Sequence, residues 1–565
     1  MSEEVKIDLV TINVDGRDVD VPVGMNLIDA VKKYAKVEIP HYCYHSKLSV
    51  AGNCRMCLVE MGMPMRDRDS GEVILEEGKP KIGWMPKPAI ACSTKTSAGL
   101  HIRTQSPMVK ECRNGVMEFL LLNHPLDCPI CDQAGECRLQ EFSTDYGRGY
   151  SRYIEEKNVK PKRSRIGPRI TLDDERCILC SRCVRFSQEI TKDSVLGFVD
   201  RGSYSTLTCY PGRELDNNYS LNVVDLCPVG ALTDNDFRFK MRVWFLKPVK
   251  SICTESSVGV NTEVWSREGK IYRITPRQND DVNDTWMSDS GRRLYRRAES
   301  EFRLFEAAVA GAPVTRDQAL EHAGALLRGE RVALVVSGHS TVEEHHLLKD
   351  MADRLEAPVW MVPHVAEGDG FLISNDRTPN TRGAIVTGLI RETPYDHIAK
   401  IKEALEHKSV ETLLVVGEDL IAAGVDRSLL EQVQVIYIGP EQNETSQLAT
   451  VVIPSLTVFE KSGTFINQNF RIQKFAQAIP GPKGVASDLS TLCHLAGLIG
   501  CEGSSASMES VWESIRSKIP ELAQVHFGNL PDEGLLMDAA RFAHLKFCET
   551  QSLHYQAVNP EPANA

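Results

Sequence analysis

Cysteine is the residue type in this chain best suited to chemistry, and it is distributed very unevenly. Fourteen of the seventeen cysteines lie within residues 1–253, and the other three are Cys493, Cys501 and Cys548. In a reducing compartment such a concentration of thiols binds metal more often than it forms disulfides. The spacing of the cysteines therefore decides which metal centres the chain can hold.

One stretch, residues 124–137, combines an imidazole and three thiols at the spacing H-x3-C-x2-C-x5-C. A short loop that carries soft ligands at such intervals can wrap one compact metal centre. The thiols are those of Cys128, Cys131 and Cys137. They need a fourth ligand, for which His124 and Cys112 are the candidates.

The choice between these two candidates depends on a predicted helix before the loop. Apolar residues recur there at helical spacing on one face, which predicts that Cys112 is a buried structural thiol. The residues on this face are Val109, Cys112, Val116, Phe119 and Leu120. His124 lies in the loop beyond the helix and is favoured as the fourth ligand, with Cys112 as the open alternative.

The N-terminal residues predict a β-hairpin followed by a helix. In residues 6–14 and 19–23, apolar and polar residues alternate as they do in strands, and the turn signal Asp15-Gly16 lies between the two segments. Residues 26–34 have helical periodicity. A hairpin, a helix and then a cysteine loop is also how a plant-type ferredoxin begins.

The cysteine loop has the spacing Cys43-x10-Cys54-x2-Cys57, and Cys92 is the next cysteine along the chain. Thiolates suit an iron–sulfur cluster because it needs several soft, anionic donors. A zinc site is the alternative, but the ten-residue gap is not a zinc-finger spacing.

A third set of cysteines resembles half of a bacterial two-cluster ferredoxin. In that family the run C-x2-C-x2-C-x3-C-P occurs twice, and the fourth cysteine of each run ligates the other cluster. Here the surviving ligands are Cys177, Cys180, Cys183 and Cys227, the last followed by proline. The lost ligand positions hold Ser187, Asn217, Ser220 and Val223. The sequence therefore predicts one [4Fe–4S] cluster here and the loss of the other, with Cys209 as a structural thiol.

The second half of the chain has a different pattern. Residues 243–302 predict a small β-rich unit whose single cysteine, Cys253, cannot hold a cluster alone. From about residue 303, strands and helices alternate, which is typical of a doubly wound parallel sheet. The expected strands are 331–337, 358–362, 411–417, 433–438 and 450–453, and the expected helices include 342–355 and 395–407. No glycine-rich phosphate-binding motif supports a nucleotide site.

Composition narrows the class of protein and its location. The net charge of -12 argues against binding to nucleic acid. One basic segment, residues 157–169, contains two prolines and a glycine and is interpreted as a solvated linker. No apolar window of about 20 residues and no leader pattern occur. The expected location is therefore cytoplasmic, with any membrane contact made only through partner proteins.

With these motifs in place, the chain resembles the large iron–sulfur subunit of respiratory complex I, the NADH:quinone oxidoreductase, which is the 75 kDa or G-type subunit. The resemblance covers nearly the whole length and is most specific in residues 40–235. Residues 124–137 match the family's one-histidine, three-cysteine [4Fe–4S] motif residue for residue, which implies that His124 is the fourth ligand.

The resemblance implies three clusters in all. The ligands it implies are Cys43, Cys54, Cys57 and Cys92 for a [2Fe–2S] cluster, His124, Cys128, Cys131 and Cys137 for a [4Fe–4S] cluster, and Cys177, Cys180, Cys183 and Cys227 for a second [4Fe–4S] cluster. Some family members carry a further cluster after position 253, but its other ligand positions here hold Ser256, Val260 and Ser288. No fourth cluster is therefore expected.

The expected fold is multidomain, α+β and then α/β. The expected domains are a plant-type ferredoxin (β-grasp) domain at 1–95, a histidine-ligated cluster domain at 96–150, a bacterial-ferredoxin-like domain at 165–242, a small β-rich domain with a lost cluster site at 243–302, a molybdopterin-oxidoreductase-like α/β domain at 303–550 and a disordered tail at 551–565. The α/β domain is interpreted as a retained scaffold, so no molybdopterin is expected.

No nucleophile–base pair or substrate pocket is evident, so no catalytic residue is predicted. The resemblance implies that the chain relays electrons from a flavin-bearing, NADH-binding subunit through its clusters towards quinone, while the whole complex translocates protons. Implied partners are that flavin subunit, a small [2Fe–2S] subunit and the quinone-side hydrophilic subunits. The alternatives are the electron-input subunit of a soluble NAD-linked hydrogenase or formate dehydrogenase, and a zinc-bound structural scaffold.

Overall fold

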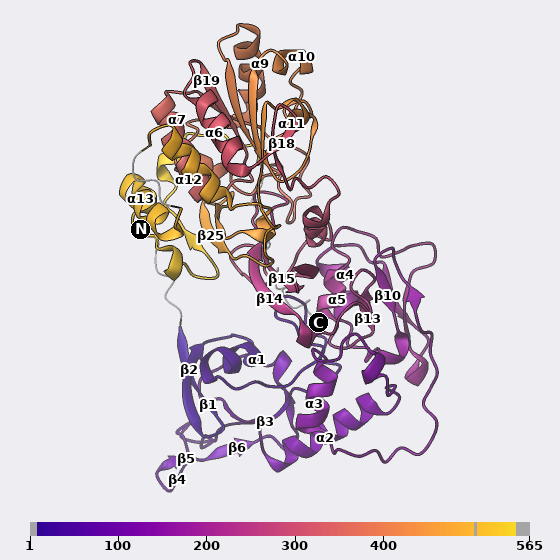
Figure 1. Cartoon of the computed structure of the whole chain (residues 1–565). Helices are drawn as coiled ribbons and strands as arrows, with labels where there is room; N and C mark the ends of the chain where they lie inside the picture. The colour runs from indigo at the N-terminus through magenta and orange to yellow at the C-terminus, as the bar shows by residue number, and fades with distance from the viewer. Residues whose placement is uncertain (1–7, 502–505, 550–565) are drawn as a thin grey trace. The chain divides into compact units, whose positions relative to one another are not determined.

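The structure is a computed structural model that describes residues 8–501 and 506–549 (Figure 1). It divides into two compact units, of which one ends at Trp244 and the other begins at Phe245. The predicted tail at 551–565 and the first two residues of the strand predicted at 6–14 lie outside the described residues. Among those residues, none of the helices has both the length and the apolar character that a membrane span requires.

The first unit begins with the predicted hairpin, which joins a sheet of order β2-β1-β8-β3-β6, with β7 beside β3. Its strands are β1 (Leu9–Val14), β2 (Arg17–Pro22), β3 (Leu58–Pro64), β6 (Ile82–Trp84), β7 (Ala89–Ile90) and β8 (His101–Arg103). Asp15 and Gly16 both have positive φ, 51° and 87°, as a two-residue type I′ turn requires. Because β8 pairs with β1 and β3, this sheet continues past the domain boundary expected at residue 95.

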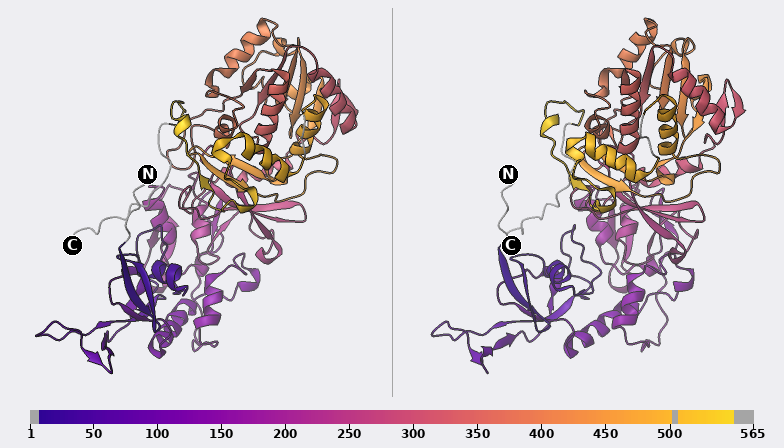
Figure 2. Two further views of the ribbon diagram at one scale, coloured as in Figure 1. Left: turned by 90° about the vertical axis from the view of Figure 1, so that its left-hand side faces the viewer. Right: turned by 60° about the vertical axis from the view of Figure 1, so that its left-hand side comes forward.

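A short helix, α1 (Leu27–Ala30), runs into a π turn at Val31–Ala35, which confirms the predicted helix at 26–34. The side chain of Asn26 caps it by accepting from the Ile28 N–H at 3.0 Å. The residues between β3 and β6 include a two-stranded hairpin, β4 (Leu75–Glu76) and β5 (Lys79–Pro80). Figure 2 shows this hairpin projecting away from the sheet.

Two helices, α2 (Pro107–Leu121) and α3 (Arg138–Tyr146), pack against each other in the segment that carries His124. The buried residues of α2 are Val109, Arg113 and Met117. The predicted buried stripe is therefore only partly correct: Val109 is buried, but Cys112 is only half-buried and Phe119 is 80% exposed. The buried face of α2 is shifted from the predicted one towards Arg113, because the guanidinium of this residue donates to the carbonyls of Thr104 and Leu58 at 3.0 and 3.1 Å.

The last segment of the first unit contains two small sheets, β13-β10-β9 and β11-β12, and two short helices. These elements are β9 (Ser164–Arg165), β10 (Ile170–Leu172), α4 (Arg182–Glu189), β11 (Leu196–Val199), β12 (Thr206–Cys209), α5 (Asn222–Leu226) and β13 (Leu232–Asp234).

The second unit opens with the predicted β-rich domain, a three-stranded antiparallel sheet of β14 (Lys247–Ile252), β15 (Asn261–Arg267) and β16 (Lys270–Pro276). The predicted parallel sheet follows, with strand order β18-β17-β23-β22-β21-β19-β20. Its parallel strands are β19 (Val332–Val336), β20 (Val359–Met361), β21 (Thr412–Val416), β22 (Gln434–Gly439) and β23 (Val451–Pro454), and the antiparallel edge is β17 (Ala307–Val309) and β18 (Ala312–Val314).

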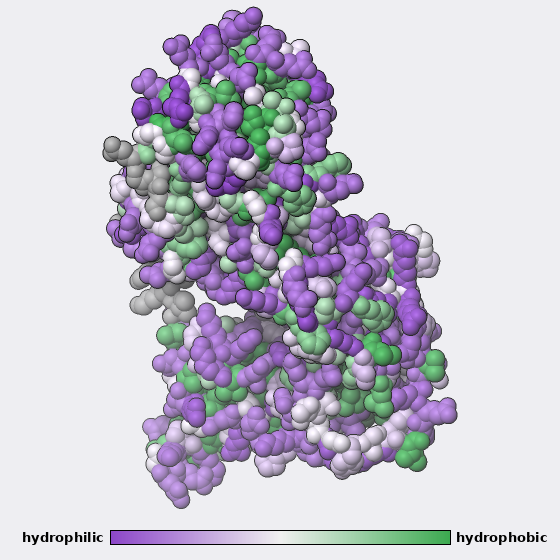
Figure 3. Space-filling view, viewed as in Figure 1, coloured by the Kyte–Doolittle hydropathy of each residue, from purple (hydrophilic) through white to green (hydrophobic). Residues whose placement is uncertain are grey.

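Helices cover both faces of this sheet, so it is doubly wound as predicted (Figure 1). Alternate residues of β19 enter different cores: Leu334 and Val336 lie in one, and Ala333 and Val335 in the other. The first core contains residues of α6 (Arg316–Leu327), α7 (Val342–Leu355), α8 (Thr381–Val386), α12 (Asp488–Leu498) and α13 (Met508–Lys518), and the second contains residues of α9 (His397–Glu406) and α10 (Arg427–Leu430). Hydrophilic residues predominate on the face shown in Figure 3.

A further antiparallel sheet closes the second unit, formed by β24 (Gly463–Ile466), β25 (Arg471–Phe475) and β26 (Leu535–Leu536). Its β24 packs against α7 and α8, and β25 packs against β14 of the β-rich domain. The remaining helix, α11 (Glu444–Leu448), is capped by the Asn443 side chain.

Candidate metal centres

The first predicted ligand set comes together beside β3 and β7. Cys57 directly precedes β3, and Cys92 lies in the 3₁₀ turn Ala91–Ser93. The thiol of Cys43 hydrogen bonds with those of Cys54 and Cys92, and Cys57 hydrogen bonds with Cys92. The structure thus links the four thiols in a chain of contacts from Cys54 through Cys43 and Cys92 to Cys57. The Cys43 N–H also lies 3.5 Å from Cys54 Sγ.

Hydrogen bonds within this set divide the thiols by acidity. The bond from Cys54 lowers the pKa of Cys43, and the bond from Cys92 lowers the pKa of Cys57. The two donors, Cys54 and Cys92, have raised pKa values because they hold these bonds. Hydrogen bonds that favour loss of the proton from Cys43 and Cys57 make this set suited to a metal that binds thiolates. The donor set fits a [2Fe–2S] cluster in number and chemistry.

The second set lines a cavity of about 1170 Å³, which His124, Cys128, Cys131 and Cys137 share. Cys112 is not among its lining residues, so the geometry favours His124 as the fourth ligand. Burial, followed by the charge of Lys157, lowers the pKa of His124 to about 4. The imidazole is therefore neutral at ordinary pH, which is the form that ligates metals.

The loop that carries His124 is held by the basic segment that follows α3. Lys157 Nζ donates to the carbonyls of Leu121 and Leu122 at 2.9 and 2.7 Å. The Asn158 N–H donates to Asn123 Oδ1 at 3.1 Å. We call residues 157–162 the strap. Most of its residues are exposed, as expected of a solvated linker, but hydrogen bonds and ion pairs tie them to neighbouring loops.

The strap also reaches the other side of His124. Lys162 Nζ lies 2.7 Å from a carboxylate oxygen of Asp127 and 2.7 Å from one of Glu175. Arg176 donates to the same Asp127 at 2.9 Å. The residues on both sides of His124 are thus anchored from outside its own loop. Sequence reasoning missed this because the partners of Lys157 are main-chain carbonyls, which no side-chain pattern reveals.

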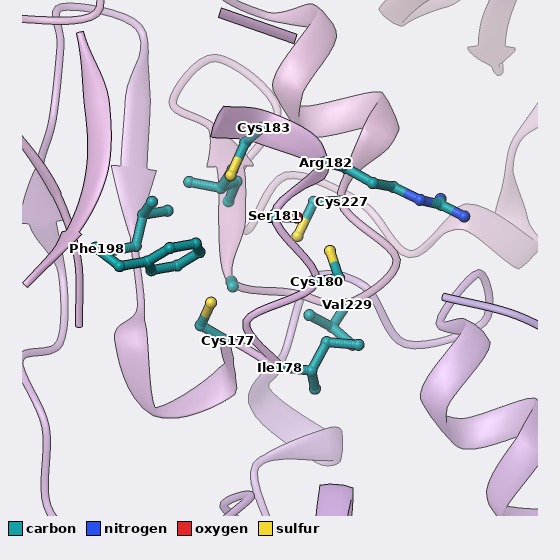
Figure 4. A pocket seen from close by; sticks show the side chains of 12 residues that line it. Cys177, Ile178, Cys180, Ser181, Arg182, Cys183, Phe198, Cys227 and Val229 are labelled. Atoms are coloured by element: carbon teal, nitrogen blue, oxygen red, sulfur yellow. The ribbon is translucent and has the colours of Figure 1, made fainter. Parts of the chain in front are cut away.

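The third set lines one pocket, into which the sulfur atoms of Cys177, Cys180, Cys183 and Cys227 point (Figure 4). Leu179 and Ser181 have left-handed backbones, with φ of 55° and 60°, which wrap the ligand loop around the pocket. The Leu179 N–H donates to Cys177 Sγ at 3.4 Å. Apolar side chains, including Ile178, Phe198 and Val229, complete the lining.

Burial controls the ionisation of this third set. It raises the pKa of each of the four thiols, that of Cys227 to about 12. An isolated thiolate here would lack solvation, so these thiols ionise only when a metal neutralises them. Four buried or partly buried thiols with main-chain N–H groups aimed at sulfur fit a [4Fe–4S] cluster.

The residues at the positions of the lost ligands take part in the packing of this domain. Ser187 is fully buried in α4, and its Oγ donates to the Val184 carbonyl at 3.0 Å. Asn217 donates to Asp193 at 3.2 Å, and Ser220 and Val223 are buried. Cys209 Sγ donates to the Ile166 carbonyl at 3.3 Å, in keeping with the structural role expected for it.

The ligand segments of the third set contact those of both other sets. Towards the first set, the Asn53 side chain donates to the Leu179 carbonyl at 3.1 Å. Towards the second set, the Arg138 N–H donates to the Pro228 carbonyl at 3.1 Å. A Cβ added at Gly230 would lie 2.2 Å from Cys131 Sγ. Sequence reasoning does not single out Gly230, although a glycine so close to a ligand in the sequence is a signal of close backbone approach.

The positions of the possible fourth cluster, in the second unit, are all buried: Cys253, Ser256, Val260 and Ser288. The Cys253 N–H donates to the Val260 carbonyl at 2.8 Å. Ser288 Oγ donates to Glu255 and accepts from the Gly291 N–H at 3.1 Å. With one thiol and two hydroxyls at these positions, the donors do not fit a cluster.

Family models match five stretches of the chain. They are a 2Fe-2S iron-sulfur cluster binding domain at 8–107, the NADH-ubiquinone oxidoreductase-G iron-sulfur binding region at 113–152, the ferredoxin-like domain of NADH-quinone oxidoreductase subunit 3 at 167–233, the 4Fe-4S domain of NADH-ubiquinone oxidoreductase NDSU1/NuoG-like proteins at 246–296 and the molybdopterin oxidoreductase family at 380–498. Together with the three ligand sets, these matches define an iron–sulfur protein that combines [2Fe–2S] and [4Fe–4S] domains.

Curated relatives carry the same names. The G subunit of NADH-quinone oxidoreductase from Rickettsia conorii is 38% identical over 61% of this chain and 49% of its own length. The mitochondrial NADH dehydrogenase iron-sulfur protein 1 of Solanum tuberosum is 38% identical over 62% of this chain and 45% of its own length. Subunit 3 of NADH-quinone oxidoreductase from Thermus thermophilus is 36% identical over 62% of this chain and 47% of its own length. The chain is thus related to the large iron–sulfur subunit of NADH-quinone oxidoreductase, and it spans about half the length of these relatives.

Among solved structures, a chain of the NAD⁺-reducing [NiFe]-hydrogenase is 25% identical, over 41% of this chain and 91% of its own length, with a TM-score of 0.34. That score is too low to show a common fold.

Proposed function

We propose that the chain is an electron-transfer subunit of an NADH:quinone oxidoreductase. In this role it relays electrons from a flavin-bearing subunit, through one [2Fe–2S] and two [4Fe–4S] clusters, towards quinone. The observation that supports this most is the arrangement of the three ligand sets in the first unit, where the Cys177 set contacts the segments of both others.

The residues of the chain would hold the clusters as follows. The ligands would be Cys43, Cys54, Cys57 and Cys92 for the [2Fe–2S] cluster, His124, Cys128, Cys131 and Cys137 for one [4Fe–4S] cluster, and Cys177, Cys180, Cys183 and Cys227 for the other. When bound, such clusters supply one-electron transfer. The chain contributes burial and N–H groups near sulfur, which exclude water and set the potentials.

The contacts also support an order for the three sites. The Cys177 set lies in the middle, because Asn53 joins it to the first set and Gly230 joins it to the second. Electrons that enter at the Cys43 set would therefore reach the His124 set last. Among the residues that the structure describes, neither the altered site around Cys253 nor the α/β domain adds a further ligand set of this kind. We assign the second unit a scaffolding role without molybdopterin.

The proposed partners are the flavin and NADH-binding subunit, a small [2Fe–2S] subunit and the quinone-side hydrophilic subunits of the complex. The chain would sit on the cytoplasmic face of the inner membrane, held there by these partners. Proton translocation would be a property of the whole complex.

The experiment is low-temperature EPR on the full chain after anaerobic cluster reconstitution. We expect one [2Fe–2S] and two [4Fe–4S] signals. A third cubane would contradict the loss of ligands at Ser187 and around Cys253. Zinc without acid-labile sulfide would contradict the proposed function and favour a structural scaffold. Co-purification of the native protein only with a soluble hydrogenase or formate dehydrogenase would contradict the assignment to the quinone reductase.

A further inference from the structure

A buried arginine on α4 joins the first and third ligand sets. Arg185 is 8% exposed, although it carries a positive charge. Its Nη2 donates to the carbonyl of Cys43, a ligand of the first set, and lies 3.4 Å from the carbonyl of Cys180, a ligand of the third. One guanidinium nitrogen therefore bridges the backbones of two ligands from different centres.

The other donors of Arg185 are also directed at ligand loops. Its Nη1 donates to the carbonyl of Ser49, within the loop between Cys43 and Cys54, and its Nε lies 3.2 Å from Ser181 Oγ. Ser49 is fixed in turn by Glu189, which accepts from its N–H at 2.8 Å. The guanidinium is thus held in one orientation by at least four acceptors, and its position is defined by the two loops it joins.

The charge of Arg185 has no anionic partner among the described residues. Its acceptors are three carbonyls and one hydroxyl, and none of the ion pairs that the structure describes includes it. A buried cation with only neutral acceptors is costly unless an anion lies close by. Iron–sulfur clusters with four thiolate ligands are net anions, and the two ligand sets beside Arg185 would each hold one.

The neighbouring Arg182 has the same kind of environment. It donates to the carbonyl of Leu226, the residue before Cys227, and to that of Tyr44, the residue after Cys43. It therefore spans the same two sets one turn earlier on the chain. Arg185 makes the more direct link between the two sets, because its acceptors include the carbonyls of the ligands themselves.

We propose that Arg185 is a shared positioning residue of the two centres whose ligands are all cysteines. It ties the backbone of Cys43 to that of Cys180 and supplies the counter-charge that both clusters need when bound. This inference rests on the proposed function. Reduction adds a negative charge to a cluster, and a nearby cation stabilises that charge, so Arg185 raises both reduction potentials.

The test is potentiometric EPR on the reconstituted full chain and its variant Arg185→Met. We expect both Cys-ligated centres to become harder to reduce: at a fixed potential, the ratio of reduced to oxidised cluster falls about tenfold, which is 59 mV for a one-electron couple. The His124 centre should keep its potential, because none of the four acceptors of Arg185 belongs to its ligand loop, and it serves as an internal reference.

Arg213→Met is the matched control, because this arginine is 54% exposed and pairs with Asp193. It removes the same charge from the same domain and should leave all potentials unchanged. An arginine that only stabilised the fold would lower the thermal midpoint of Arg185→Met without moving the two potentials together. That result, or a shift of only one of the two, would overturn the inference.

Arg185→Lys covers the case in which Arg185→Met does not load its clusters. Lysine keeps the charge, but its single nitrogen cannot also reach Ser49 and Ser181. Both centres should therefore load, with potentials close to those of the wild type. Loss of one Cys-ligated centre while the other remains at its wild-type potential would overturn the inference. Absence of iron–sulfur signals in the wild type would instead contradict the proposed function.

Discussion

Lys157 Nζ lies 2.7 Å from the carbonyl oxygen of Leu122, two residues before His124. The carbonyls in the last turn of a helix have no partner within that helix, and a lysine is well suited to donate to them. By donating to Leu121 as well, Lys157 fixes the end of α2 and hence the start of the ligand loop. The strap therefore orders the second metal site from a segment that supplies no ligand.

Lys157→Met should weaken retention of the His-ligated cluster. The variant removes two hydrogen bonds to the end of α2 and should cost about 1 kcal/mol locally, since the side chain is partly solvated. In a chelator challenge of the loaded chain followed by EPR, the His124 signal should decay several-fold faster while the two Cys-ligated signals decay as before. Lys110→Met, an exposed lysine on the same helix, is the control. Equal decay in both variants would contradict a role for the strap.

Gly230 makes a second testable contact, because a Cβ there would lie 2.2 Å from Cys131 Sγ. Once Cys131 ligates a metal, its sulfur cannot move away, so Gly230→Ala should exclude or distort the cluster of the neighbouring domain. We expect a several-fold loss of the His124 EPR signal per chain. Gly197→Ala, where the nearest atom is an ordinary 3.7 Å away, should load normally. A full His124 signal in Gly230→Ala would show that the two segments separate on loading.

His124→Cys tests the fourth ligand of the second set. A thiolate in place of a neutral imidazole makes the cluster more negative, so its reduction potential should fall, the reverse of the effect of histidine in Rieske centres. Redox titration followed by EPR measures the shift. Cys112→Ser should leave the spectrum and potential unchanged, because Cys112 does not line the cavity. The assignment is wrong if Cys112→Ser abolishes the signal and His124→Cys does not alter it.

Much of the fold could be predicted because its signals are local. Asp15-Gly16 predicts a two-residue hairpin turn by its own backbone preference, and the apolar runs of β19 and β21 identify buried parallel strands. The predicted helix at 342–355 has those limits in the structure. Ligand spacing likewise identified sets whose members the structure brings together.

Other features depend on contacts between distant segments and were therefore not predictable. The face of α2 that is buried carries Arg113, whose cost of burial is offset by two carbonyls from other elements. Lys157 and Arg185 are charged residues that a sequence assigns to the surface by default. Their acceptors are main-chain carbonyls, which every residue has and which leave no trace in residue type.

His345 offers a test of pH dependence in the α/β unit. It is fully buried on α7, its Nε2–H donates to the Ser337 carbonyl at 2.9 Å, and Asn380 lies 3.4 Å from its Nδ1. Burial lowers its pKa from 6.5 to about 4. The unfolded chain therefore binds a proton more readily than the folded one between these two values, so the stability that neutral His345 contributes is complete above pH 6.5 and is lost as pH falls towards 4.

We expect this loss to reach about 3 kcal/mol near pH 4, since each pKa unit corresponds to about 1.4 kcal/mol. The quantity to measure is the difference in unfolding free energy between the wild type and His345→Asn, from urea titrations of the second unit's transition at several pH values. Taking the difference cancels the pH-dependent contributions of other titratable groups. One of these is Glu344, whose pKa is raised by burial to about 7 and whose contribution has the opposite slope.

The wild-type advantage in unfolding free energy should shrink steadily below pH 6.5. His322→Asn, at an exposed position on α6, should give a difference that is flat with pH. A flat difference for His345→Asn as well would mean that the ring is protonated as easily inside the fold as outside it.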